Sequence, residues 1–111
     1  MNARTNCVEI RILQPGAETP AIQNEFETWF VKEGDDLVFL CPLRGNPGVD
    51  EQLKWFHGML EFKRKYIRRL EAKGVSMVVR IYITGRSLFL QPESLFLGHH
   101  LHLKTEIHLN P

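Results

Sequence analysis

The sequence predicts one α+β domain, in which a four- to five-stranded, mainly antiparallel sheet is covered on one face by a single long helix, with a short helix before the last strand. The chain has 111 residues and 43% apolar side chains, which suits one hydrophobic core and is too short for two. Several short runs alternate apolar and polar residues, as strands do. One longer run repeats its apolar residues every three or four positions, as an amphipathic helix does.

The first strand is predicted over Cys7–Leu13. Its apolar residues alternate with charged ones in the order Val8, Glu9, Ile10, Arg11 and Ile12, the pattern of a strand with one buried face. The following stretch, up to Ala21, is polar and interrupted by proline, so we expect a loop or one helical turn there.

A β-hairpin is predicted next. Residues 26–31 and 37–41 are rich in aromatic and β-branched side chains, which favour strands. The segment between them, Lys32-Glu33-Gly34-Asp35-Asp36, carries the glycine and aspartate that are typical of a turn between two strands.

The long helix is predicted over residues 50–73. Asp50 is a good N-cap, and Lys73-Gly74 supplies a basic last turn followed by the glycine that commonly ends a helix. Apolar residues recur on one side of this helix and predict the face that packs on the sheet: Leu53, Phe56, Leu60, Ile67 and Leu70, widened by Trp55, Met59, Phe62 and Tyr66.

The C-terminal part is predicted to complete the sheet. Residues 75–83 are β-branched and indicate a strand buried on much of both faces. Residues 91–98 have proline early and glycine late, as in a short helix. The last strand, residues 100–109, alternates an inner face with an outer face, respectively Leu101, Leu103, Ile107, Leu109 and His100, His102, Lys104, Glu106, His108. We expect the second face of the sheet to be partly open, with apolar exposure if Trp29, Tyr82 or Phe89 project there.

Composition points to a cytoplasmic protein without membrane insertion. The N-terminus is polar and lacks the apolar core of a secretory signal, and no apolar run approaches the roughly 18 residues of a membrane span. Cys7 and Cys41 are isolated from one another in the sequence, so we expect free thiols rather than a disulfide.

Charge is unevenly distributed and suggests a partner-binding surface. Residues 1–53 carry 4 Lys/Arg against 9 Asp/Glu, a balance of −5, whereas residues 54–111 carry 10 against 4, a balance of +6. The long helix places Lys54, Arg64, Lys65 and Arg68 away from its apolar side, and this basic ridge suits an acidic protein partner. Nucleic acid is disfavoured because the predicted isoelectric point is near 7.9 and the neighbouring aromatic residues fall on the core side.

A metal site is the alternative. His100 and His102 project from the same face of the last strand, as ligands of one ion would. Zinc needs three or four ligands, and Glu106 lies about 13 Å from His102 along an extended strand. A second strand would therefore have to contribute. No cofactor is predicted, and no catalytic residue either, because no serine or cysteine has the sequence context of a nucleophile.

The order of these elements resembles a numbered family of bacterial domains of unknown function. The residues that carry the resemblance are the aromatic strand with its Lys-Glu-Gly turn (Trp29 to Gly34), the helix end Ala72-Lys73-Gly74, and the C-terminal segment Leu88-Phe89-Leu90-Gln91-Pro92-Glu93-Ser94-Leu95. Such a resemblance implies a fold and no activity, although related small bacterial domains often act as immunity or accessory proteins. We therefore expect a non-catalytic protein-binding module, with a protein partner or a homodimer.

Overall fold

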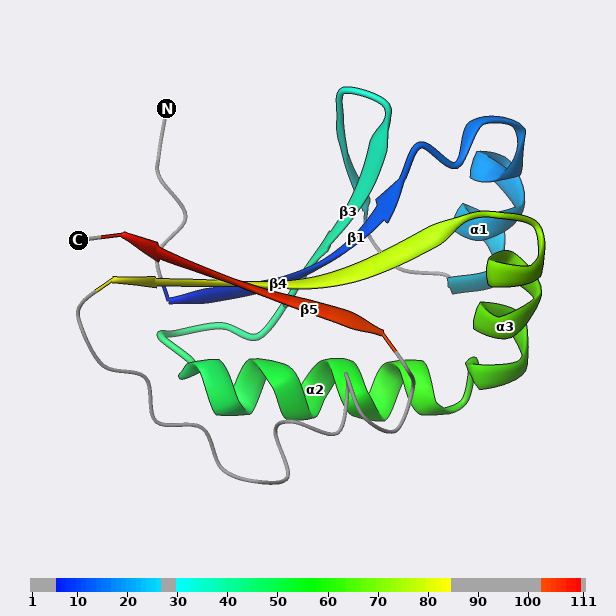
Figure 1. Cartoon of the computed structure of the whole chain (residues 1–111). Helices are drawn as coiled ribbons and strands as arrows, with labels where there is room; N and C mark the ends of the chain where they lie inside the picture. The colour runs from blue at the N-terminus through cyan, green and yellow to red at the C-terminus, as the bar shows by residue number, and fades with distance from the viewer. Residues whose placement is uncertain (1–5, 27–29, 85–102, 111) are drawn as a thin grey trace.

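The computed structural model describes residues 6–26, 30–84 and 103–110. Figure 1 shows a sheet with helices on one side and at one end. In chain order the elements are β1 (Cys7–Leu13), the 3-10 turn η1 (Gly16–Glu18), α1 (Thr19–Phe26), β2 (Phe30–Glu33), β3 (Asp36–Leu40), α2 (Val49–Glu61), α3 (Arg64–Ala72), β4 (Ser76–Thr84) and β5 (Lys104–Asn110).

The described strands form one five-stranded sheet in the order β2-β3-β1-β4-β5. β2 with β3, β3 with β1 and β1 with β4 pair antiparallel, whereas β4 and β5 pair parallel. The α+β class is confirmed, and the sheet is mixed. The apolar pattern of the last strand could not give its direction, since side chains alternate in the same way whichever way a strand runs.

The core lies between the sheet and the helices. Figure 1 shows α2 running along one face of the sheet, with α1 and α3 together at one end. Alternate residues of the three inner strands point to this side, and each is at most 5% exposed: Val8, Ile10, Ile12, Leu37, Phe39, Met77, Val79, Ile81 and Ile83. Buried helix residues meet them: Ile22, Phe26, Leu53, Phe56, Leu60, Ile67 and Leu70.

The prediction of a single helix over residues 50–73 is wrong, because the chain breaks at Phe62 and Lys63. A continuous helix would bury a residue between Leu60 and Ile67 on the core side, and the sequence offers only Lys63 or Arg64 there. Burying an unpaired cation is costly. The break instead lets the Lys63 ammonium lie 3.2 Å from Glu25 of α1. The helix also begins one residue earlier than predicted, with Gly48 as its N-cap and Asp50 in the first turn.

The strand predicted over residues 26–31 is also corrected. Phe26 is the last residue of α1, a helix where the sequence predicted at most one turn, and β2 begins at Phe30. The aromatic residues that favoured a strand instead form a cluster in which the Phe39 ring lies 5.1 Å from Phe26 and 3.9 Å from Phe30. Tertiary packing of Phe26 therefore overrides its local strand preference.

Two predicted turns are confirmed. β2 and β3 form the expected hairpin, and Gly34 in its two-residue loop has a φ of 60°, which glycine adopts without strain. Gly74 has a φ of 84° and follows α3. The Gly74 amide donates to the Glu71 carbonyl at 2.9 Å and the Val75 amide to the Leu70 carbonyl at 2.9 Å, the hydrogen bonds of a Schellman helix end.

The last strand runs from Lys104 to Asn110 in the described part of the chain, residues 100–102 of the predicted strand lie outside it, and the described residues are less buried than predicted. Leu103 is 4% exposed, as expected for an inner residue, but Ile107 is 50% and Leu109 60% exposed. β5 is an edge strand, so only one of its sides has a neighbouring strand among the described residues. The predicted short helix at 91–98 lies outside the described residues.

A glutamine that the sequence did not single out joins α2 to the sheet. β3 ends at Leu40, opposite Glu9, so the backbone of β1 before Glu9 has no β3 residue beside it. Gln52 takes this place: its Oε1 accepts from the Val8 amide at 2.9 Å, and its Nε2 donates to the Asn6 carbonyl at 2.9 Å and the Pro47 carbonyl at 3.1 Å. The Gln52 side chain, 5% exposed, thus substitutes for a strand peptide.

Candidate functional site

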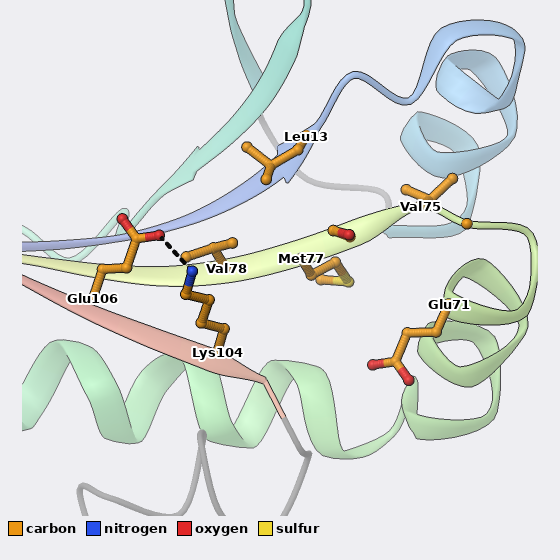
Figure 2. A pocket seen from close by; sticks show the side chains of 9 residues that line it. Leu13, Glu71, Val75, Met77, Val78, Lys104 and Glu106 are labelled. Carbon is orange, nitrogen blue, oxygen red and sulfur yellow. Dashed lines mark ion pairs between the residues drawn. The ribbon is translucent and has the colours of Figure 1, made fainter.

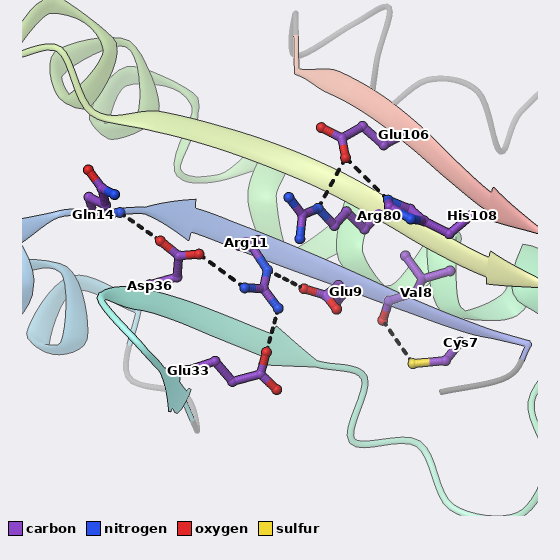
Figure 3. A network of polar contacts seen from close by, with 10 residues as sticks. All are labelled: Cys7, Val8, Glu9, Arg11, Gln14, Glu33, Asp36, Arg80, Glu106 and His108. Atoms are coloured by element: carbon purple, nitrogen blue, oxygen red, sulfur yellow. Dashed lines mark hydrogen bonds and ion pairs between the residues drawn. The ribbon is translucent and has the colours of Figure 1, made fainter. Parts of the chain in front are cut away.

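The sheet face turned away from the helices is charged. Register pairs Glu9 of β1 with Arg80 of β4, and Arg80 with Glu106 of β5, so these three side chains form a row across the sheet. Figure 3 shows this row together with the cluster around Arg11. Apolar residues lie on this face as well, since Val38 and Val78 are buried there and Leu40 is 37% exposed, and the expectation of apolar exposure through Trp29, Tyr82 or Phe89 stays a prediction. Tyr82 does lie on this face, half-buried, whereas Trp29 and Phe89 are outside the described residues.

Arg11 is the centre of the larger cluster. Its Nε lies 2.8 Å from Glu9 Oε2 and its Nη1 lies 3.0 Å from Asp36 Oδ2, while Nη2 donates to Glu33. These carboxylates belong to β1, β3 and β2, so one guanidinium ties three strands together (Figure 3). Burial alone would lower the pKa of Arg11, but its hydrogen bonds to the three carboxylates outweigh burial and raise it. The Arg11 side chain is 11% exposed and permanently charged.

Asp36 has a second partner in this cluster. Its Oδ1 accepts from the Gln14 amide at 3.0 Å, which fixes the chain as it leaves β1. Burial alone would raise the pKa of Asp36, but the hydrogen bonds from Gln14 and Arg11 outweigh it and lower that pKa. Asp36 is therefore ionised in the folded protein well into the acidic range.

A smaller cluster lies where β4 meets β5. The Glu106 carboxylate lies 3.2 Å from Arg80 Nε and 3.2 Å from His108 Nε2. The Tyr82 ring stacks on the His108 ring at 5.0 Å. Burial, followed by a hydrogen bond to Glu9, raises the pKa of the Tyr82 hydroxyl. Tyr82 therefore connects the two clusters, through its hydrogen bond to Glu9 and its stacking on His108.

These contacts link the strands of the sheet to one another through ion pairs. Glu33, Asp36 and Glu106 each pair with an arginine of another strand, and Glu9 pairs with Arg11 of its own strand. Within residues 6–26, 30–84 and 103–110, no group of three or more His, Cys, Asp and Glu side chains is arranged to hold a metal ion. Cys7 and Cys41 are both half-buried, and neither belongs to a disulfide.

One pocket of about 390 Å³ lies at the end of this face (Figure 2). Its apolar walls include Leu13 and Val78, and its charged rim carries Glu71 of α3 with Lys104 and Glu106 of β5. Lys104 Nζ is 3.8 Å from Glu106, so that pair is already internally neutralised. Among its charged lining residues, Glu71 and Lys104 are exposed and Glu106 is half-buried, so none of the three is a buried polar group that would orient a small ligand.

An exposed phenylalanine that the sequence did not predict lies at the corner between α2 and α3. Phe62 is 88% exposed, although the helical pattern predicted it on the apolar side. Phe26, Phe39 and Phe56, by contrast, are at most 6% exposed. The break after Glu61 removes Phe62 from the core, and an open hollow beside it is lined by Glu61, Phe62, Arg64 and Lys65.

The predicted basic residues divide between two helices. Lys54 is exposed on α2, whereas Lys65 and Arg68 are exposed and Arg64 is half-buried on α3. No ion pair between described residues involves Lys54, Lys65 or Arg68. Because the chain turns at Phe62 and Lys63 (Figure 1), they do not form one straight ridge. Arg64 and Lys65 line the hollow beside Phe62, and Arg68 lies one helical turn further along α3.

The predicted metal ligands His100 and His102 lie outside the described residues, so the metal site stays a prediction. Sequence reasoning missed Phe62 as a surface residue because helical periodicity assumed an unbroken helix. The sequence did contain one sign of the break: in an unbroken helix, Lys63 would fall on the core side.

Comparisons with known proteins leave the family open. No family model matches the chain, and neither a curated protein nor a solved structure is significantly similar to it. The resemblance to bacterial domains of unknown function therefore stays a prediction. Among the described residues, no helix combines the length and the apolar character needed to cross a bilayer.

Proposed function

We propose that this chain is a non-catalytic protein-binding domain whose contact surface is the α2–α3 corner, defined by Phe62, Arg64, Lys65 and Arg68. The single observation that carries the proposal is the 88% exposure of Phe62. A lone exposed aliphatic residue would need no explanation. A protruding phenylalanine among cations is different, because aromatic and arginine side chains supply much of the energy at protein interfaces.

The charge of α3 supports an acidic partner. The helix carries Arg64, Lys65, Arg68 and Arg69 against one carboxylate, Glu71, while Ile67 and Leu70 on its other side are buried. A basic helix face of this kind attracts an acidic surface and steers its approach. Lys54, a further exposed cation of α2, is proposed to extend this basic surface toward the start of that helix.

The remaining surfaces support this proposal indirectly. The sheet face away from the helices has its charges paired within the chain, so a partner would have to break those pairs to use them. An immunity-type or accessory role is what the family resemblance implies, and binding to an acidic protein is compatible with it. Metal binding through His100 and His102 is the alternative.

Capture from native cell extract tests the proposal. We expect wild-type protein on a support to retain a specific partner that Phe62→Ala or Arg68→Glu loses, with affinity reduced at least about tenfold. Raised salt should weaken the same complex. Leu43→Ala is the matched control, since Leu43 is also exposed, at 41%, but lies in the loop before α2.

Folding must be checked for each variant. Truncation of Phe62 at 88% exposure should leave the unfolding free energy within about 0.5 kcal/mol of wild type. If the stable Phe62→Ala and Arg68→Glu proteins retain the same partner as fully as wild type, the α2–α3 corner is not the binding surface.

A further inference from the structure

β5 lies at the edge of the sheet that the described strands form, and it carries apolar side chains. It is seven residues long and ends the sheet. Among the described residues, no strand pairs with its outer side. Ile107 is 50% and Leu109 60% exposed on the helix side of the sheet. An exposed edge strand is a template for pairing with another strand, and proteins normally block it.

We infer that β5 pairs antiparallel with β5 of a second copy of this chain, with Ile107 on the two-fold axis. The strand runs from Lys104 to Asn110, so its middle residue is Ile107. Full overlap of two antiparallel copies therefore places Ile107 opposite Ile107 of the other copy. This interface is separate from the α2–α3 corner and does not depend on the proposed function.

The side chains brought together by this register are complementary on both faces. On the helix side, Ile107 meets Ile107 and Leu109 meets Thr105 of the other copy. On the other face, Glu106 lies opposite His108 of the other copy, a pair of residues that already contact each other at 3.2 Å within one chain. Directly opposed residues in antiparallel strands interact, and apolar and hydrogen-bonding pairs are favourable. The register covers exposed Ile107 and Leu109 without placing like charges opposite each other.

Neighbouring registers are worse. Paired residues must share a face of the sheet, so the axis has to pass through a residue. An axis at Glu106 would oppose two carboxylates, and one at His108 would oppose two imidazoles. An axis at Thr105 would need Leu103, which is 4% exposed and packed in the core, to pair with Ile107. The β5 strand is therefore most complementary to a second copy of itself in the register with Ile107 on the axis.

Strand pairing over seven residues is a small interface, so the dimer should be weak and dependent on concentration. Sedimentation equilibrium up to roughly 1 mM protein measures it. We expect dimer in wild type, none in Ile107→Lys, which opposes two cations, and unchanged dimer in the control Leu43→Lys. Circular dichroism confirms that each variant is folded. Phe62→Ala should dimerise normally, which separates this inference from the proposed function.

Cysteine cross-linking tests the register itself. In a Cys7→Ser, Cys41→Ser background, Ile107→Cys places two thiols opposite each other, whereas Thr105→Cys places each thiol opposite Leu109. Under mild oxidation we expect a covalent dimer from the first variant in large excess over the second. A wild-type monomer at the highest concentration, a dimer that survives Ile107→Lys, or equal cross-linking at both positions overturns the inference.

Discussion

Replacement of Gln52 by leucine should be among the most destabilising single changes on α2. The side chain is 5% exposed and makes three hydrogen bonds to backbone groups of Asn6, Val8 and Pro47. Leucine fills a similar volume but leaves the buried Val8 amide without an acceptor, which costs about 1–3 kcal/mol. The two carbonyl groups are partly buried and can turn to water, so each lost bond adds about 0.5 kcal/mol.

The sum is a loss of about 2–4 kcal/mol, a large share of the roughly 5–15 kcal/mol that stabilises a domain of this size. Urea unfolding followed by circular dichroism measures it, and the midpoint should fall while the slope with urea stays unchanged. Gln23→Leu is the matched control, because Gln23 is exposed on α1 and its replacement should change stability by less than about 0.5 kcal/mol. An equally small effect of Gln52→Leu would refute the view that its side chain substitutes for a strand peptide.

Two further predictions concern acid and metal. The pKa of Asp36 is lowered below its ordinary 3.8 in the folded protein, so its contribution to stability is complete above that value and is lost as pH falls through the folded pKa. Unfolding free energies measured from pH 7 down to pH 3 should therefore decline less steeply in Asp36→Asn than in wild type, and parallel curves would contradict this. If His100 and His102 hold a metal with a third ligand, calorimetric titration with zinc should show saturable binding that His102→Ala weakens; no saturable binding would remove that alternative.

The period-2 and helical patterns in the sequence were sufficient to predict the α+β class. β1 was predicted with its observed bounds because five alternating residues leave only one way to bury Val8, Ile10 and Ile12. The glycines at the hairpin and after α3 were equally informative, since positive φ at Gly34 and Gly74 is a local property of glycine. Such local signals do not depend on which distant segment lies beside them.

The candidate surfaces depend on contacts between distant segments. The break that exposes Phe62 follows from the cost of burying Lys63 and from its ion pair with Glu25, a residue of another helix. The aromatic contacts that keep Phe26 helical involve β3 and α3. The parallel direction of β5, which leaves Ile107 at an exposed edge, cannot be predicted from side-chain alternation.

The sequence by itself determined the fold class, the first strand, the hairpin turn and the glycine that ends the second long helix, because neighbouring residues alone set backbone preference and periodicity. Only the tertiary structure decided that the predicted helix is two helices, that Arg11 joins three strands through Glu9, Glu33 and Asp36, and that Phe62 faces solvent. Each of these features depends on whether a side chain is buried and which residue pairs with it. Because those partners are far apart in the sequence, they meet only in the folded chain.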